Sequence, residues 1–273
     1  MKRIKKPKPL FRKKPPPGSS VAAGAGFHGV TAGFPEFWQK AHDHCPEVFK
    51  AAYDLVPRVK SFLQRPVKGP LATLEYFLTA IVANSLGALI TLALNGYGHD
   101  AVRVARGMYE AAVNATYLKL HPTEVDDYVE FHWVRQKKLL DYFQRYSPSD
   151  LSRIPAKSIA EINAEFTRVA PLFQDSRGKP RGSWCKKDLR ARAEEVGLGE
   201  FHPTFYAYAS GIHHGDIDGL IAQSANNALR VELAPSFDGM RDALIMGSIA
   251  VVLVLTSLND LKRGNHMKTI KTL

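Results

Sequence analysis

Cysteine is scarce in this chain of 273 residues, which contains only Cys45 and Cys185. The two cysteines are far apart and form no Cys-x-x-Cys pair. This excludes a disulfide-rich scaffold and a zinc site built from paired thiolates. Free cysteines in small number are typical of a reducing compartment, so the sequence predicts a cytoplasmic protein.

Several catalytic and metal-binding motifs are absent. The chain has no Walker loop and no Gly-x-Ser-x-Gly elbow, and it lacks the paired Glu-x-x-His motifs of a di-iron bundle. The cluster His42-Asp43-His44-Cys45 has ligand-type side chains. However, consecutive positions on a helix point about 100° apart, and Pro46 follows the cluster. We therefore expect no metal ion and no cofactor.

Strand-like alternation of apolar and polar residues is also missing. Apolar residues instead recur at steps of three and four, as between Val48 and Leu63, where Pro57 should kink or divide the helix. The sequence Ser158-Ile-Ala-Glu161 has the spacing of a capping box and predicts a helix start. The pattern predicts an all-α protein, a multi-helix bundle.

Two runs stand out as apolar around most of their circumference, residues 70–94 and 243–258. A membrane-spanning helix needs about 20 apolar residues. The first run contains Glu75 and Asn84, and the second has only 16 residues before Asn259. We expect both to be central buried helices and predict no membrane span.

Basic charge is concentrated at the N-terminus. The chain has a net charge of +11, and residues 2–14 hold eight Lys or Arg and no acid, so the rest carries +3. Residues 1–26 are predicted to be a disordered, basic, Pro-rich tail. A single helical domain over residues 27–264 and a C-terminal tail over 265–273 are expected to follow. The basic segment from Lys2 to Lys14 either contacts nucleic acid or another acidic surface, or only aids solubility.

Two rows of polar side chains could carry chemistry, because spacing of four residues places each row on one face of a helix. The first row, on a helix expected over residues 99–120, consists of Arg106, Glu110 and Asn114. The second, after Pro203, consists of Tyr206, Ser210 and His214, with His213 beside the last. The two rows are predicted to face each other.

Facing rows would form a candidate catalytic site from Arg106, Glu110, Ser210, His213 and His214. Histidine suits proton transfer near neutral pH, a carboxylate can orient it, and arginine can hold a phosphate. The alternative is structural: Arg106 and Glu110 form a buried ion pair, and His214 hydrogen-bonds across the bundle.

Trp184 is a further candidate for function. It follows a Gly-rich basic loop and precedes Lys186 and Lys187, which together could bind an anion. The other interpretation is that Trp184 anchors a helix over residues 186–196 to the core.

The segments RGMYEAAVNATYL (106–118) and SWCKKDLRARAEEVGLGEFHPTFYAYASGIHHG (183–215) resemble a large bacterial family of helical domains of unknown function. Its pattern is Arg-x-x-x-Glu, then Trp, then Tyr-x-x-x-Ser-x-x-x-His. The matching residues are Arg106, Glu110, Trp184, Tyr206, Ser210 and His214. The resemblance covers roughly residues 45–260.

That family is loosely similar to the HEPN group of helical RNases and RNA-binding domains, which is found in toxin and phage-defence operons. The HEPN signature is Arg, then four to six residues, then His, and no arginine here has a histidine at that spacing. A HEPN-type RNase would require Arg106 to meet His213 or His214 in space.

Two functions follow as hypotheses, and the sequence leaves open whether the protein is an enzyme. One is a HEPN-like enzyme or toxin that acts on RNA, with His214 as general acid or base, Glu110 orienting it and Arg106 on the phosphate. The other is a non-catalytic helical ligand-binding or interaction module whose polar rows are structural. Such a module could be a homodimer formed through residues 243–258.

Overall fold

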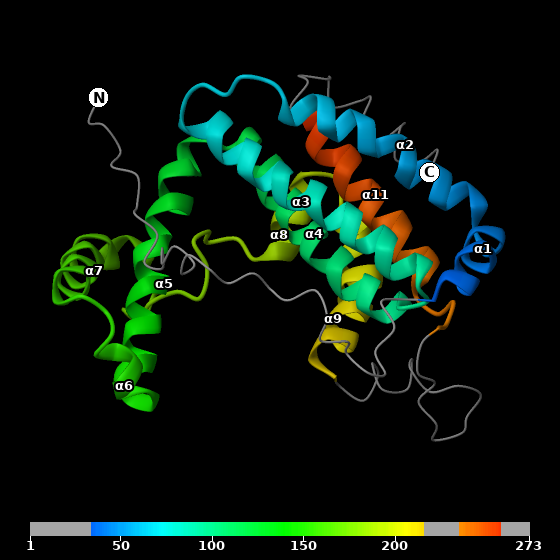
Figure 1. The fold of residues 1–273 in the computed structure, drawn as a ribbon. Helices are drawn as coiled ribbons and strands as arrows, with labels where there is room; N and C mark the ends of the chain where they lie inside the picture. The colour runs from blue at the N-terminus through cyan, green and yellow to red at the C-terminus, as the bar shows by residue number, and fades with distance from the viewer. Residues whose placement is uncertain (1–33, 216–234, 258–273) are drawn as a thin grey trace. The chain divides into compact units, whose positions relative to one another are not determined.

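The computed structural model describes residues 34–215 and 235–257. Helices hold 80% of these residues and no strand occurs among them, which confirms the predicted all-α class. The α-helices, shown in Figure 1, are α1 (Pro35–His44), α2 (Pro46–Leu63), α3 (Pro70–Leu94), α4 (Gly98–Leu120), α5 (Val125–Tyr146), α6 (Pro148–Leu151), α7 (Ala156–Val169), α8 (Leu189–Glu195), α9 (Ala207–His214) and α11 (Met240–Ser257). Short turns are η1 (Pro122–Glu124), η2 (Ala170–Phe173), η3 (Gly199–Phe201) and the π-helical η4 (His202–Tyr206). The predicted tails, residues 1–26 and 265–273, lie outside the described residues.

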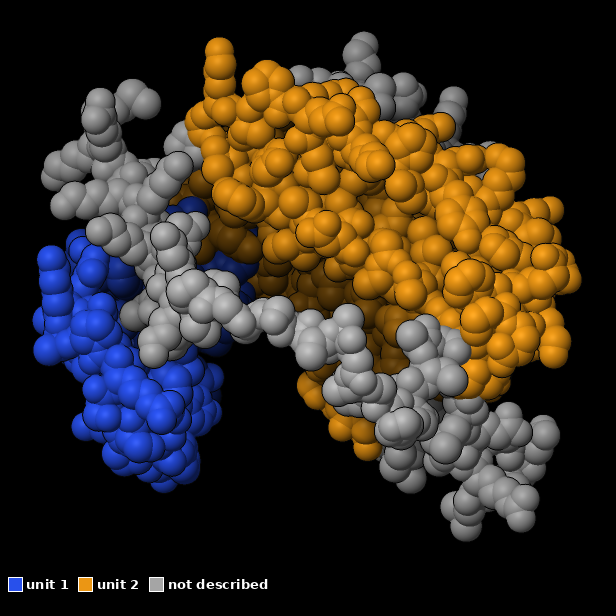
Figure 2. Space-filling model, viewed as in Figure 1, with its two compact units in different colours: residues 1–32, 129–184 blue, residues 33–128, 185–273 orange. Residues whose placement is uncertain are grey.

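The described residues divide into two compact units, which Figure 2 colours separately. The smaller unit consists of residues 129–184, and the larger consists of residues 34–128, 185–215 and 235–257. The boundary at residue 129 falls within α5. The expectation of one domain over residues 27–264 stays a prediction.

The smaller unit packs α5 against α7 and η2. The rings of Phe131 and Phe173 meet edge to face with their centroids 5.2 Å apart, and both are buried. Arg168 on α7 forms ion pairs with Glu130 on α5 and, at 2.8 Å, with Glu165 on its own helix. Exposed pairs of this kind contribute little, so the apolar contacts hold the unit together.

Two helices differ in detail from the sequence expectations. α2 continues through Pro57 from Pro46 to Leu63, so the proline does not divide it. α7 begins at Ala156, and the expected capping residue Ser158 lies inside its first turn. The reason is that the Pro155 carbonyl accepts hydrogen bonds from the amides of Ser158 and Ile159, at 2.9 and 3.2 Å, and so opens the helix earlier.

The core of the larger unit is built from α4, α11 and α3, with α2 also packed on α11. α11 is the most enclosed of these helices: from Ala243 to Leu255 every side chain but that of Ile245 is buried. Gly247 allows the close approach, because a Cβ there would lie 2.8 Å from Cδ1 of Leu89 on α3. The absence of a side chain at this position therefore leaves room for the Leu89 side chain between two central helices.

The two apolar helices predicted from the sequence differ in burial. Leu71–Leu94 and Met240–Ser257 are both long and apolar enough to cross a membrane, and within an apolar stretch of 18 residues in each, 39% and 72% of the residues, respectively, are buried inside the structure. α3 exposes Phe77 and Ile81 on one face. Core helices of soluble proteins meet the same criteria of length and composition. The expected absence of a membrane span stays a prediction.

The turn between α3 and α4 is fixed against the segment that leads into α11. The Ser236 amide donates a hydrogen bond to the Gly96 carbonyl at 2.9 Å. A Cβ on Gly98 would lie 1.9 Å from the carbonyl oxygen of Asp238. Only glycine fits at this first position of α4, and the contact aligns the N-terminal ends of α4 and α11.

Candidate functional site

A stripe of polar side chains runs along one face of α4 at steps of three and four residues, which keeps them on one side of a helix. We call this set the α4 stripe: Arg103, Arg106, Glu110, Asn114, Tyr117 and His121. α8 and α9 both pack against α4. The stripe includes the whole predicted row 106/110/114 and extends beyond it in both directions.

The centre of the stripe is a chain of hydrogen bonds through Tyr206. Nη2 of Arg106 donates to the Tyr206 hydroxyl at 3.0 Å, and that hydroxyl donates to Oε1 of Glu110 at 3.1 Å. Arg106 Nη2 and Glu110 Oε1 also form an ion pair at 3.0 Å. The three side chains are therefore joined to one another, although Nε of Arg106 is buried without a hydrogen-bond partner in the described part of the chain. The predicted contact between the two rows occurs at this point.

Aromatic rings enclose this contact. The Arg106 guanidinium lies over the Tyr206 ring, 5.0 Å from its centroid, and the His202 ring stacks on Tyr206 at 4.8 Å. Burial raises the pKa of Tyr206, and the Glu110 carboxylate raises it further. Burial lowers the pKa of His202, so its imidazole is neutral near pH 7. The sequence interpretation missed His202, although its spacing of four from Tyr206 on a helix was a usable signal.

Tyr206 is placed by an unusual backbone turn. His202–Tyr206 is π-helical, and Pro203 lies in its first turn. Amide groups of a first turn have no partner within the helix, so the missing amide hydrogen of proline costs no hydrogen bond there. π-helical turns are rare and often occur at functional sites. The turn leads directly into α9, so its last residue faces α4 while α9 continues along it.

The predicted histidines do not join the Arg106–Glu110–Tyr206 contact. Among the described residues, neither His213 nor His214 forms a hydrogen bond or ion pair with Glu110; both are exposed, and their rings contact each other at 5.0 Å. Ser210 likewise forms no hydrogen bond with Arg106 or Glu110 in the described part of the chain.

The direction of α9 explains this separation. Tyr206 contacts Glu110, whereas the Ile212 carbonyl accepts hydrogen bonds from Nε and Nη2 of Arg103, at 3.3 and 3.2 Å. α9 therefore runs antiparallel to α4, and its last turn lies beside the N-terminal part of α4. At 1.5 Å per residue, His214 is about 12 Å along the helix axis from Tyr206. Arg103 also stabilises the C-terminal carbonyls of α9.

Asn114 pairs with α8 instead of α9. Its Oδ1 accepts a hydrogen bond from Nη1 of Arg192, whose side chain is only 6% exposed. Nε of Arg192 donates to the Asp188 carbonyl at 3.3 Å. Burial lowers the pKa of Arg192, but a guanidinium stays charged at neutral pH. This buried cation between α4 and α8 was not predicted, because nothing in the local pattern of α8 distinguishes it from its exposed neighbours.

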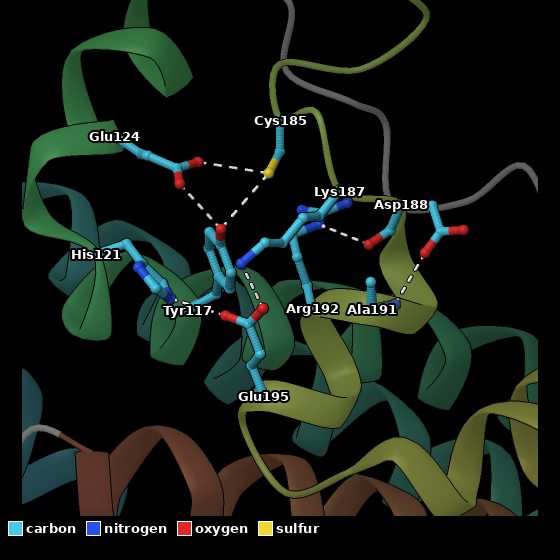
Figure 3. A network of polar contacts seen from close by, with 9 residues as sticks. All are labelled: Tyr117, His121, Glu124, Cys185, Lys187, Asp188, Ala191, Arg192 and Glu195. Carbon is cyan, nitrogen blue, oxygen red and sulfur yellow. Dashed lines mark hydrogen bonds and ion pairs between the residues drawn. The ribbon is translucent and has the colours of Figure 1, made fainter.

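A second polar cluster lies at the C-terminal end of the stripe (Figure 3). The Tyr117 hydroxyl donates to Oε1 of Glu124 at 2.9 Å, and the Cys185 thiol donates to Oε2 of the same carboxylate at 3.4 Å. Burial raises the pKa of the Cys185 thiol, and the Glu124 carboxylate contributes. The thiol is thus kept protonated as a hydrogen-bond donor, the opposite of an activated nucleophile.

Glu195 of α8 completes this cluster, as Figure 3 shows. Nζ of Lys187 donates to Oε1 of Glu195, and Nε2 of His121 lies 2.8 Å from Oε2. The Lys187 hydrogen bond holds the pKa of Glu195 below its ordinary value, with a smaller effect from His121. Nζ of Lys187 also lies 5.5 Å from the centroid of the Tyr117 ring. Lys187, one of the residues that could bind an anion in the first interpretation of Trp184, is therefore paired with a carboxylate.

Trp184 is buried, with 5% of its surface exposed. α8 begins after it, at Leu189, three residues later than the helix expected over 186–196. Its N-cap is Asp188, whose carboxylate accepts a hydrogen bond from the Ala191 amide at 2.8 Å. The role of Trp184 as an anchor or as part of an anion site stays a prediction.

The comparisons with known proteins give one match. A family model described as a family of unknown function (DUF5677) matches residues 76–227, which contain the α4 stripe, α8 and α9. This confirms the resemblance to a helical family of unknown function. Neither a curated protein nor a solved structure matches the chain. A bacterial origin and a relationship to the HEPN group stay predictions.

Proposed function

The chain belongs to this family of unknown function, and we propose that it is a non-catalytic helical ligand-binding or interaction module whose α4 stripe is structural. The observation that supports the proposal is the mutual pairing of Arg106, Glu110 and Tyr206. Nη2 of Arg106 and Oε1 of Glu110, through which these side chains could act on a substrate, are instead bound to each other and to the Tyr206 hydroxyl. The stripe then positions α8 and α9 on α4.

A proton-transfer step needs a general acid or base within hydrogen-bond reach of the reacting group. His213 and His214 lie beside Arg103, at the opposite end of the helix contact from Glu110, and His202 is stacked on Tyr206. No described histidine is oriented by Glu110. This favours the module over the HEPN-like enzyme.

The HEPN-like alternative retains one supporting observation. The Glu110 side chain is 38% exposed, so solvent reaches the carboxylate beside Arg106. An RNA phosphate could approach Arg106 there if Glu110 moved. A toxin or phage-defence role and nucleic-acid binding through Lys2–Lys14 belong to this alternative.

The test measures RNA cleavage. The full-length wild type and the double variant His213→Ala/His214→Ala are each incubated with single-stranded RNA and with transfer RNA. We expect no cleavage by either protein and melting temperatures within about 2 °C of each other, because both histidines are exposed. Cleavage by the wild type that the double variant lacks, with the melting temperature unchanged, would overturn the proposal.

A further inference from the structure

A cavity of about 370 Å³ lies in the larger unit between the η3–η4–α9 segment and the first turns of α11. Its volume is within the range of small-molecule sites. The lining side chains are mostly aromatic or aliphatic, with three polar ones: Phe201, Thr204, Phe205, Tyr208, Asp242, Ile245 and Met246. None of these residues belongs to the α4 stripe, so the cavity is a separate feature.

Two polar groups of the lining have no partner among the described residues. The Asp242 carboxylate and the Tyr208 hydroxyl form no hydrogen bond or ion pair with any other described side chain or backbone group. The third polar group, the Thr204 hydroxyl, donates to the Glu200 carbonyl at 3.0 Å and is thereby engaged. Asp242 is solvent-exposed and Tyr208 is partly exposed, so the cavity offers a ligand one carboxylate and one hydroxyl that solvent also reaches.

The lining of the cavity contains an acidic side chain and no basic one. Neither lysine nor arginine lines it, and the acidic residue is Asp242, in the first turn of α11. Burial raises the pKa of Tyr208, and Asp242 and Asp238 raise it further, so the hydroxyl is protonated and neutral. Such a site repels phosphates and carboxylates and attracts cations.

We propose that this cavity binds an organic ammonium ion with an apolar body, the ammonium group against Asp242 and the apolar body among Phe201, Phe205 and Met246. Aromatic rings attract cations through the negative face of the π system, and an ion pair with a carboxylate adds direction. The apolar walls exclude a bare metal ion, which needs several oxygen ligands. This inference rests on the proposed function, because it names the ligand class of the module.

The π-helical turn provides the geometry. Thr204 and Phe205 lie within η4, while Tyr208 belongs to the first turn of α9. The wider turn alters the angular spacing between these side chains relative to a continuous α-helix. The same turn thus places Tyr206 against α4 and its neighbours Thr204 and Phe205 in the lining of the cavity.

The test uses isothermal titration calorimetry of the full chain with 2-phenylethylammonium, with neutral 2-phenylethanol as the comparison. A ligand of this size should bind with a dissociation constant of roughly 0.1–1 mM. We expect the ammonium ion to bind at least about tenfold more tightly than the alcohol, and Asp242→Asn to remove that difference. Asp238→Asn removes a nearby charge outside the lining and should change binding less than about twofold.

A blocking variant gives an independent readout. Thr204 is exposed, so Thr204→Trp should fill the cavity and abolish binding while the melting temperature stays within a few degrees of wild type. Equal affinity for the alcohol and the ammonium ion, or unchanged binding to Asp242→Asn, would contradict the proposal. Failure of binding together with absence of RNA cleavage would refute this ligand class and leave the module proposal standing, whereas histidine-dependent RNA cleavage would refute the module itself.

Discussion

The Tyr206 hydroxyl, on the π-helical turn before α9, donates a hydrogen bond at 3.1 Å to Oε1 of Glu110 on α4, and it accepts one from Arg106 at 3.0 Å. Tyr206→Phe removes both bonds and keeps the ring. We expect a loss of about 1–2 kcal/mol in the free energy of unfolding, because both partners are charged and one is half-exposed. Urea denaturation followed by circular dichroism measures it.

Tyr146→Phe is the matched control for that variant, since this tyrosine is 67% exposed and its hydroxyl has no hydrogen bond within the described residues. Its effect should be below about 0.5 kcal/mol. Equal effects of the two substitutions would show that the Tyr206 hydroxyl does not hold α9 on α4.

The buried guanidinium of Arg192 allows a comparison within one helix. Arg192→Leu leaves Oδ1 of Asn114 without its partner, and we expect a loss of about 2–4 kcal/mol. Within the described part of the chain, the only ion pair of Arg190, two residues earlier, is an exposed i,i+4 pair with Glu194. Arg190→Leu should therefore cost less than about 0.5 kcal/mol. Chemical denaturation of both variants measures the two losses. The prediction is wrong if Arg192→Leu and Arg190→Leu unfold at the same denaturant concentration.

The pH dependence of stability should reveal the Lys187–Glu195 interaction. The pKa of Glu195 is lower in the folded protein than in the unfolded chain, so its stabilising effect is complete above the unfolded-state pKa and disappears as the pH falls through the folded-state pKa. The free-energy difference between wild type and Glu195→Gln should therefore shrink from about pH 6 to about pH 3.

Lys187→Met provides the control for this titration, because Lys187 is the main cause of the lowered pKa. In the Lys187→Met background, the Glu195→Gln difference should depend less on pH. A difference that stays constant with pH in the wild-type background would mean that the ion pair contributes nothing in solution.

Two glycines of α4 should respond to alanine in opposite directions. Gly98→Ala places a Cβ 1.9 Å from the Asp238 carbonyl oxygen, so the segment before α11 must move, and we expect a loss of about 2–4 kcal/mol. Gly107 lies in the helix interior, and a Cβ at this position would have no atom of another part of the structure within 4 Å. Gly107→Ala should stabilise the protein by about 0.5–1 kcal/mol. Thermal and urea unfolding give both values, and a stabilised Gly98→Ala would show that the turn and α11 are not in contact.

Several features could be read from residues close together in the chain. The periodicity of apolar side chains gave the helical class, and the Arg106–Glu110 spacing gave an ion pair that the structure contains. The stripe could have been extended to Tyr117 and His121 by the same spacing. These are local properties of one helix, which the 3.6-residue period dictates.

Features that depend on how helices meet could not be found in this way. The pairing of Asn114 with Arg192 joins residues 78 positions apart, and the Tyr117–Glu124–Cys185 cluster depends on the loop before α8 reaching α4. The second row begins at Tyr206 in the π-helical turn and continues along α9 to His214. Only Tyr206 meets Glu110, however, because α9 runs antiparallel to α4 and carries His214 toward Arg103.

By itself, the sequence determined the helices and which of their faces are apolar or polar, because both follow from local backbone geometry and the burial of apolar area. Tertiary structure alone decided which polar faces meet and whether the helices that carry them run parallel or antiparallel. Helix direction and long-range pairing are set by the packing of the whole core, where Gly98 allows the backbone before α11 to approach α4 closely. The same packing shaped the cavity beside Asp242 and separated it from the α4 stripe.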